Sequence, residues 1–196
     1  MCIRDSSCNT PKCEIPNFTL PSKLNEFRQK DRYYDITLVA NGKEFKAHKA
    51  ILATQSAFFD ACFKECWEHS DKKIEMCDLE PEIVEAMLTF MYTGKTDCLE
   101  TMVDRILPAA DKYGVRDLKI ACENELARKL TVDNAITTLI LADTHNAKTL
   151  RQVCLHFISC CSSEVMKSDS WKELKSMEKE HLYLLELIEA LALSSP

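Results

Sequence analysis

Glycine is scarce in this chain, with only three residues among 196. A phosphate-binding loop needs several closely spaced glycines, so this class of nucleotide site is excluded. The sequence also lacks a Gly-x-Ser-x-Gly motif and a defensible pair of catalytic carboxylates, which argues against an enzyme. It has no apolar run near the roughly 18 residues that a membrane span requires, and its first residues lack the apolar stretch of a signal peptide.

Basic residues are outnumbered by acidic ones. Lys and Arg total 25 against 31 Asp and Glu, which gives a net charge of −6 and a pI of about 5.4. Surfaces that bind nucleic acid or anionic membranes carry clustered Lys and Arg, so we expect neither partner. The remaining composition, 46% hydrophobic and 29% charged, is that of a globular protein. The length suits one medium domain with a small appendage.

Cysteine, in contrast, is abundant, with 11 residues. A secreted disulfide scaffold is usually shorter and has an even count. Most of these cysteines lie among Leu, Ile and Phe at helical spacing, where reduced thiols behave as small buried hydrophobes. We therefore expect a protein of the nucleus, the cytoplasm or both.

Two cysteine groups have a chemical alternative. Cys62, Cys66 and His69 are zinc-ligand types, but only three residues cluster and two lie on an apolar stripe, so buried thiols are the favoured interpretation. The adjacent pair Cys160 and Cys161 is consistent with redox activity, but a buried Cys161 beside a more exposed Cys160 is the simpler prediction. We expect no metal and no cofactor.

The first residues need separate treatment. Residues 1–6 (MCIRDS) match the translation of a transposon adapter used in sequencing libraries. We expect these six residues to be an assembly artefact and residues 1–17 to form a disordered leader.

A β-hairpin is predicted early in the chain. A short helix over 21–30 precedes it, with Leu20, Leu24 and Phe27 at i, i+4 and i+7. Two alternating segments, 35–40 and 43–48, then flank an Asn-Gly pair that suits a two-residue turn.

Helices dominate the remainder. The predicted boundary residues are Ser56 as an N-cap, Pro81 at a first turn, Gly94 and Gly114 as helix ends, and Thr131 as an N-cap. Pro108 lies inside an apolar stripe and predicts a kink or a late helix start. The other predicted elements are a third strand carrying Ile74, Met76 and Leu79, and helices over 116–130, 150–161 and 179–192. The expected class is α+β.

Two polar features remain open at this level. Asp35 and His48 flank the hairpin, and a satisfied structural network is favoured over a catalytic or ligand-binding pair. The polar stretch Lys64–Lys73 contains Trp67, whose indole either folds back on the core or anchors a partner.

Several segments of the sequence resemble those of a known family. The segments DITLVANGKEFKAHKAILATQSAFFDACF (35–63), IEMCDLEPEIVEAMLTFMYTGK (74–95) and ILPAADKYGVRDLKIACENEL (106–126) resemble the BTB/POZ domain. Residues 131–161 resemble the shortened BACK extension of speckle-type POZ proteins and their TD-and-POZ relatives. The resemblance implies a BTB/POZ fold over 18–128, a small mixed sheet with packed helices, followed by an all-helical, partial BACK extension over 129–196.

The resemblance also implies a function. Such proteins form homodimers, bind cullin-3 and act as substrate adaptors of a cullin–RING ubiquitin ligase. Their substrates are captured by a MATH domain that precedes the BTB domain. We find no MATH domain in this sequence, so we expect either a fragment or a BTB-only form that dimerises with related BTB proteins.

The resemblance also implies interface residues, which are those at positions that match the family's contact residues. For the dimer interface they are Leu20, Leu24, Phe27 and Ile51. For cullin-3 they are Phe63, Glu65, Cys66, Trp67, Glu68 and His69. The family's cullin motif is a hydrophobic residue, any residue, then glutamate; Trp67 fits the first position, but His69 replaces the glutamate. Cys160 likewise replaces an aromatic residue used for higher-order assembly.

Two alternatives of other classes remain. One is a BTB dimer that scaffolds transcriptional corepressors, although such domains usually precede zinc fingers and no Cys/His repeat follows here. The other is a regulatory dimerisation partner that binds no cullin, for which His69 is the main support.

Overall fold

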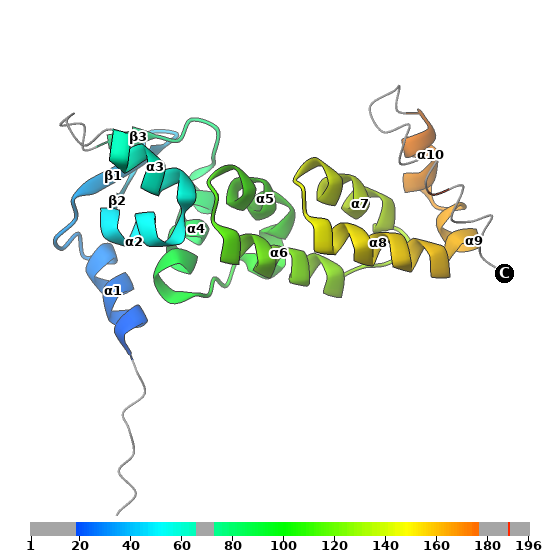
Figure 1. The fold of residues 1–196 in the computed structure, drawn as a ribbon, viewed down its shortest axis with the longest axis horizontal. Helices are drawn as coiled ribbons and strands as arrows, with labels where there is room; N and C mark the ends of the chain where they lie inside the picture. The colour runs from blue at the N-terminus through cyan, green and yellow to red at the C-terminus, as the bar shows by residue number, and fades with distance from the viewer. Residues whose placement is uncertain (1–18, 66–72, 177–187, 189–196) are drawn as a thin grey trace, which may run out of the picture.

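The computed structural model describes residues 19–65, 73–176 and Ile188. A small sheet with surrounding helices lies at one end, and a row of further helices extends from it (Figure 1). This arrangement confirms the predicted α+β class. The elements are α1 (Leu20–Gln29), β1 (Ile36–Ala40), β2 (Lys43–Ala47), α2 (Lys49–Gln55), α3 (Ala57–Glu65), β3 (Lys73–Glu75), α4 (Pro81–Thr93), α5 (Leu99–Lys112), α6 (Arg116–Arg128), α7 (Ala135–Thr144), α8 (Lys148–Cys160), α9 (Ser162–Val165) and α10 (Asp169–Ser176).

The sheet has the strand order β2-β1-β3. β1 and β2 pair antiparallel with Leu38 opposite Phe45, and Asn41 and Gly42 form the turn with φ angles of 46° and 80°. Two positive φ angles in a two-residue loop are those of a type I′ turn, so the predicted hairpin is confirmed. All of β1 is buried, which means that both faces of this central strand are covered.

The third strand is shorter than predicted. β3 pairs parallel with β1, and the N–H of Met76 adds one hydrogen bond to the carbonyl of Val39 at 2.7 Å. Leu79 lies beyond the strand, in the turn before α4, where its N–H donates to the carbonyl of Met76 at 3.2 Å.

Several predicted helix ends are confirmed. The Ser56 hydroxyl accepts a hydrogen bond from the N–H of Phe59 at 3.1 Å, which makes Ser56 the N-cap of α3. Pro81 lies in the first turn of α4, and Gly94 ends that helix with a φ of 73°.

The α5–α6 corner is a Schellman motif. Gly114 has a φ of 61°; its N–H donates to the carbonyl of Asp111 at 3.1 Å, and the N–H of Val115 donates to that of Ala110 at 2.9 Å. These two bonds satisfy carbonyls at the end of α5. The prediction that Gly114 follows the helix end is confirmed.

Pro108 lies within α5, and the backbone break comes six residues earlier. Met102 has the non-helical angles φ −131° and ψ 24°. The uninterrupted part of α5 therefore starts at Val103 and includes Pro108. A break in this helix was predicted, but the structure places it at Met102 and not at the proline.

Thr131 does not cap a helix, which corrects the prediction. Its N–H donates to Oδ1 of Asn134 at 2.8 Å, while Nδ2 of Asn134 donates to the carbonyl of Lys129 at 2.9 Å. This Asn-centred turn occupies the residues assigned to the first helical turn, so α7 begins at Ala135.

Three helices were not predicted from periodicity: α2, α9 and α10. The first two have seven and four residues, too few for a periodic signal. α10 is capped by Ser168, whose hydroxyl accepts from the N–H of Trp171 at 3.3 Å. The helix predicted over 179–192 lies outside the described residues, except for Ile188, which is buried.

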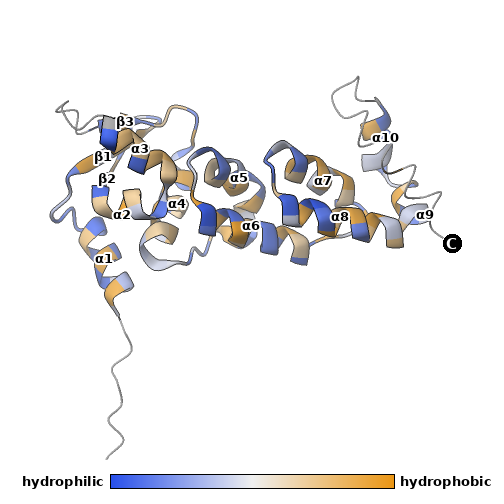
Figure 2. Cartoon of the chain, viewed as in Figure 1, coloured by the Kyte–Doolittle hydropathy of each residue, from blue (hydrophilic) through white to orange (hydrophobic). Residues whose placement is uncertain are grey.

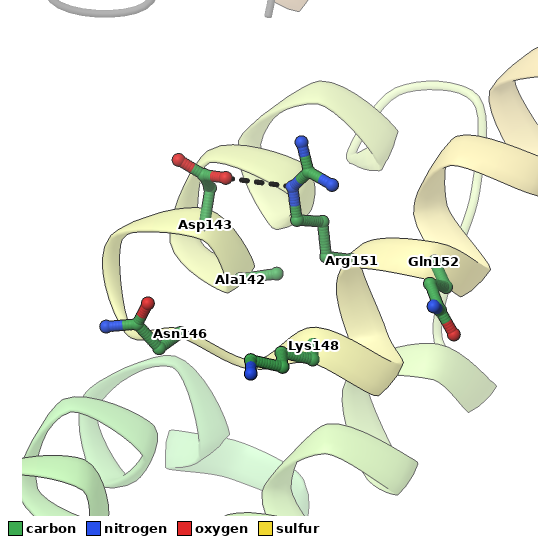
Figure 3. Close-up of a pocket in the computed structure, with 7 residues that line it drawn as sticks. Ala142, Asp143, Asn146, Lys148, Arg151 and Gln152 are labelled. Carbon is green, nitrogen blue, oxygen red and sulfur yellow. Dashed lines mark hydrogen bonds and ion pairs between the residues drawn. The ribbon is translucent and has the colours of Figure 1, made fainter.

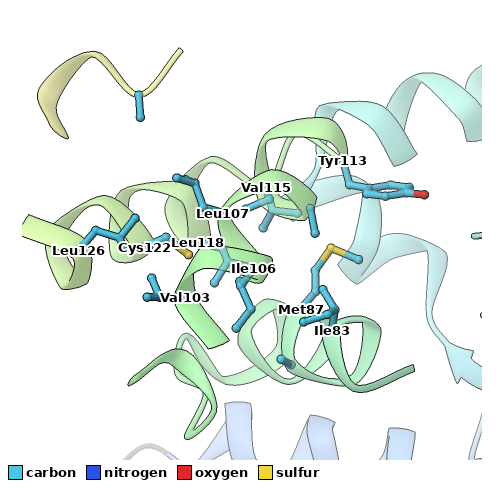
Figure 4. Close-up of a cluster of buried hydrophobic side chains, with 14 of the residues drawn as sticks. Ile83, Met87, Val103, Ile106, Leu107, Tyr113, Val115, Leu118, Cys122 and Leu126 are labelled. Carbon is cyan, nitrogen blue, oxygen red and sulfur yellow. The ribbon is translucent and has the colours of Figure 1, made fainter. Parts of the chain in front are cut away.

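One continuous core runs from the sheet into the helical extension. Figure 4 shows Met87 of α4, Ile106 of α5 and Leu118 of α6 within one buried cluster. Full burial of such a side chain contributes roughly 1.5–3 kcal/mol. Figure 2 shows polar and apolar residues alternating along α5 to α8, as in amphipathic helices that share a core.

Candidate interaction surfaces

A buried arginine holds α1 against α4. Arg28 is 5% exposed, and its guanidinium donates to both carboxylate oxygens of Glu85, at 3.1 and 2.6 Å. Its Nε donates to Oδ1 of Asn25 at 3.0 Å, and its Cζ lies 5.6 Å from the ring centroid of Tyr92. This bidentate contact fixes which face of α1 points inward.

The outer face of α1 carries exposed apolar side chains. Leu20 is 48% exposed and Phe27 is 39% exposed, while Leu24 is half-buried against the core. Their i, i+4, i+7 spacing places them along one side of the helix. A row of exposed large apolar side chains is typical of an interaction surface.

Tyr33 extends this row, and the sequence analysis missed it. Its side chain is 84% exposed, and its ring meets that of Phe27 edge-on with centroids 6.2 Å apart. Tyr33 lies in a turn with a φ of 56°, so helical periodicity could not reveal it. We call Leu20, Leu24, Phe27 and Tyr33 the α1 surface.

Ile51, the fourth predicted dimer residue, lies on α2. It is half-buried and packs against the core. The structure holds one chain, so the dimer role of Leu20, Leu24, Phe27 and Ile51 stays a prediction.

The predicted cullin-binding region begins on α3. The ring of Phe63 stacks on Phe59 with centroids 5.9 Å apart, and Nζ of Lys49 lies 5.5 Å from its centroid. Phe63, Lys49 and Ala53 help to line a cavity of about 380 Å³ between α2 and α3. Asp35 and Asp60 also line it, so the end of α3 adjoins a cavity with an aromatic wall and charged residues of both signs.

The rest of that region is only partly visible. Glu65 ends α3, and its side chain is outside the described part of the chain. The predicted residues Cys66, Trp67, Glu68 and His69 also lie outside the described residues. Their role, and the alternative for Trp67, stay predictions.

Asp35 and His48 form a satisfied structural network. Oδ1 of Asp35 accepts from the N–H of Lys49 at 2.7 Å, at the start of α2. Nδ1 of His48 lies 2.7 Å from the hydroxyl of Tyr92, and its Nε2 lies 2.8 Å from the carbonyl of Arg32. The structural interpretation favoured from sequence is therefore confirmed.

These contacts assign the His48 tautomer. A carbonyl only accepts, so Nε2 carries the hydrogen that points to Arg32. Nδ1 then accepts from the Tyr92 hydroxyl, which itself accepts from the backbone N–H of His48 at 2.9 Å. Burial raises the pKa of Tyr92 to about 12, so this hydroxyl stays a donor at physiological pH.

The described cysteines agree only in part with the prediction of buried thiols, since Cys62 and Cys98 are half-buried and Cys77 is exposed. Cys122 and Cys154 are buried, and Cys160 is exposed beside a half-buried Cys161. Among the residues that the structure describes, no group of three or more His, Cys, Asp or Glu side chains could hold a metal. Two members of the zinc alternative, Cys66 and His69, lie outside them. Within the same part of the chain, no helix has the length and apolar character needed to cross a membrane.

A polar cavity of about 370 Å³ lies at the α7–α8 turn (Figure 3). Nε of Arg151 donates to Oδ1 of Asp143 at 2.9 Å across it, so these two charges neutralise each other. Asn146 and Lys148 line the side toward α6.

Comparisons with known proteins identify both parts of the chain. A family model described as BTB/POZ domain matches residues 24–130, more than half of the 196 residues. A second model, described as BPM/SPOP, BACK domain, matches residues 134–181. The fold is similar to a solved structure of the BTB domain of zebrafish PATZ1, with 27% identity, a TM-score of 0.50, and coverage of 55% of this chain and 88% of that chain.

Proposed function

This chain belongs to the BTB/POZ domain family, and on that premise we propose that it is a homodimeric adaptor that docks cullin-3 and recruits substrates for ubiquitination. One observation carries the proposal: a BTB domain and a BACK domain of the BPM/SPOP type match the same chain in succession. BTB and BACK domains are interaction modules, so the functional residues are those that meet partners.

The α1 surface supports the dimerisation step. Leu20, Phe27 and Tyr33 expose 48%, 39% and 84% of their area in the single chain. Burial of exposed apolar side chains against a second copy is favourable at roughly 25 cal/mol per Å². A self-complementary contact of this kind is isologous and closes as a dimer.

The cavity between α2 and α3 supports the cullin step. It lies beside Phe63, two residues before the end of α3. The hydrophobic-x-glutamate motif of the family follows this helix. A hydrophobic side chain inserted next to such a cavity is an arrangement typical of binding hot spots.

A titration calorimetry experiment with the N-terminal domain of cullin-3 tests the proposal. The full chain is expected to bind one cullin domain per protomer of a dimer. The substitution His69→Glu restores the family's acceptor and is expected to tighten binding by about 1–2 kcal/mol, roughly 5- to 30-fold.

The matched control is His156→Glu, the same substitution at an exposed position of α8. It is expected to leave cullin-3 affinity unchanged. A folded dimer that binds no cullin-3, either with His69 or with Glu at that position, contradicts the adaptor proposal.

The second candidate function is a BTB dimerisation partner, or corepressor-type scaffold, that binds no cullin. The observation that favours it is His69 in place of the motif's glutamate. A neutral imidazole offers one acceptor where a carboxylate offers several. Binding that appears only with His69→Glu would select this candidate.

A further inference from the structure

A second polar cavity lies where α6 meets the start of α8. Its volume is about 410 Å³. α6 contributes Arg116, Lys119 and Ile120 to its wall, and the α8 side contributes Asn146, Lys148 and Thr149. Nζ of Lys119 on α6 donates to the carbonyl of His145, in the turn between α7 and α8, at 2.7 Å.

Two cations in this cavity have no carboxylate partner within residues 19–65 and 73–176. The neighbouring cations of α5 to α8 are neutralised within the chain, through Arg105–Glu80, Lys112–Asp78, Lys119–Asp111, Arg128–Glu125, Lys129–Glu125 and Arg151–Asp143. Arg116 and Lys148 form no ion pair with any residue that the structure describes. Their two charges therefore remain available, and they line one cavity.

The position of these cations is unfavourable for the chain itself. Arg116 and Lys148 are the first residues of α6 and α8. A helix N-terminus carries partial positive charge, so cations there are disfavoured. Asp117 offsets this in the first turn of α6. The first turn of α8 contains no acidic residue, which makes a role in stabilising the isolated chain a poor explanation for Lys148.

The acidic group in the wall is already engaged. Glu123 is 9% exposed, and its Oε2 accepts from the N–H of Leu150 at 3.4 Å within the first turn of α8. Lys119 is neutralised by Asp111 at 2.6 Å. Glu123 keeps its negative charge at the inner side of the wall, whereas the exposed charged side chains of the lining are Arg116 and Lys148.

Ile120 supplies an apolar side chain to the same wall. Its side chain is 47% exposed and lines the cavity. A ligand that matches this wall carries anionic groups beside an aliphatic side chain.

We propose that this cavity binds an acidic segment of a partner protein, in which carboxylates flank an apolar residue. A nucleic acid fits less well because the wall has no aromatic side chain on which bases stack. Carboxylates of a short peptide form charge-assisted hydrogen bonds with Arg and Lys.

Fluorescence anisotropy with the full chain tests this inference. The probe is a labelled peptide of alternating Glu and Asp around a central Leu, and its partner probe carries Gln and Asn instead. The acidic peptide is expected to bind saturably and to weaken with added salt, while the amide peptide does not bind. The double substitution R116Q/K148Q is expected to weaken binding by about tenfold.

The matched control is K95Q/K167Q, which removes two exposed cations elsewhere. Neither Lys95 nor Lys167 has a carboxylate partner in the described part of the chain, so the net charge changes equally. The control is expected to change affinity by less than about twofold. An equal loss of affinity in both double variants would show that binding depends only on the net charge of the protein, and this result would overturn the proposal.

Two further outcomes also overturn it. One is equal binding of the amide peptide, and the other is displacement of the acidic peptide by a single-stranded oligonucleotide at lower concentration than by unlabelled peptide. Circular dichroism checks that R116Q/K148Q is folded. If that double variant is not folded, Ile120→Ser takes its place as the test. Loss of this exposed aliphatic contact is expected to weaken binding of the acidic peptide about threefold.

Discussion

At the scale of single residues, Arg28 determines where α1 lies. Its side chain is 5% exposed while that of its partner Glu85 is 41% exposed, so one end of this pair is buried and the other reaches solvent. The pair joins segments 57 residues apart in the chain. A substitution at Arg28 therefore tests the anchor of the α1 surface without changing that surface.

Arg28→Ala is expected to lower the free energy of unfolding by about 2 kcal/mol. The loss combines the bidentate charged hydrogen bonds with the cation–π contact of the guanidinium with the ring of Tyr92. It stays below the cost of breaking a fully buried pair because Glu85 can be solvated. Urea unfolding at one fixed protomer concentration measures it.

The control for this prediction is Lys30→Ala. Lys30 pairs with Glu26 on the exposed side of the same helix, and such i, i+4 pairs contribute about 0.3–0.5 kcal/mol. Equal losses for Arg28→Ala and Lys30→Ala would show that the buried contact does not anchor α1.

Two buried thiols give a pH-dependent prediction. Burial raises the pKa of Cys122 to about 12 and that of Cys154 to about 12. The folded state thus holds the proton more tightly than the unfolded state, where cysteine titrates near about 8.5. Their stabilising contribution is complete below that unfolded value, and it is lost as the pH rises towards 12.

Pulsed iodoacetamide labelling with mass spectrometry measures this directly. At mildly alkaline pH, Cys122 and Cys154 are expected to react far more slowly than the exposed Cys77 and Cys160. All four are expected to react alike after unfolding in urea. Fast labelling of Cys122 in the folded protein would contradict its placement in the core.

At the scale of elements, the α5–α6 corner depends on Gly114. Its φ of 61° is disfavoured for residues with a Cβ, and an added Cβ would lie 3.4 Å from the amide nitrogen of Phe58 and 3.6 Å from that of Ala57. These are the first two amides of α3, which have no intrahelical acceptor. A methyl group here would shield them from water.

Gly114→Ala is expected to cost about 2–3 kcal/mol of stability. The left-handed conformation accounts for about 1–2 kcal/mol, and the shielded amides account for the rest. The matched control is Gly94→Ala, at a φ of 73° with nothing within 4 Å of an added Cβ, for which only the conformational cost is expected. Equal midpoints of urea unfolding for the two variants would contradict the contact with α3.

Elements with a local cause were predictable from the sequence. The Asn41-Gly42 hairpin, the Ser56 cap and the Gly114 corner each depend on residues within a few positions. The predicted start of α7 was wrong because Thr131 and Asn134 compete for the same cap position, and the turn centred on Asn134 forms instead. Short α2 and α9 offer no period to detect.

The candidate surfaces were predictable only in part. The spacing of Leu20, Leu24 and Phe27 indicated one face of α1, and their exposure agrees with that. Tyr33 escaped notice because its exposure depends on a turn with positive φ. The convergence of Arg116 and Lys148 depends on how α6 packs on α8, which no local pattern reveals.

At the scale of the whole molecule, the chain is one continuous core with two outward-facing regions. The core extends from Ile36 in the sheet to Ile188. The α1 surface lies on the sheet-containing end, and the cavity with Arg116 and Lys148 lies farther along the row of helices (Figure 1). This separation allows a dimer contact and a second partner to be present together.

Both candidate functions require a dimer, so the molecular mass of the protein in solution tests both of them. The tested variant is Phe27→Glu, which places a charge in the middle of the proposed contact. The control is Val153→Glu on α8, because Val153 and Phe27 are both 39% exposed. Neither substitution is expected to unfold the chain, since both side chains reach solvent.

Light scattering coupled to size exclusion is the measurement that tests this account most directly. The wild-type chain and Val153→Glu are expected to show twice the 22.4 kDa chain mass at micromolar concentration, and Phe27→Glu is expected to show 22.4 kDa. A folded wild-type chain of 22.4 kDa, or a Phe27→Glu variant that keeps the doubled mass, would contradict dimerisation through the α1 surface.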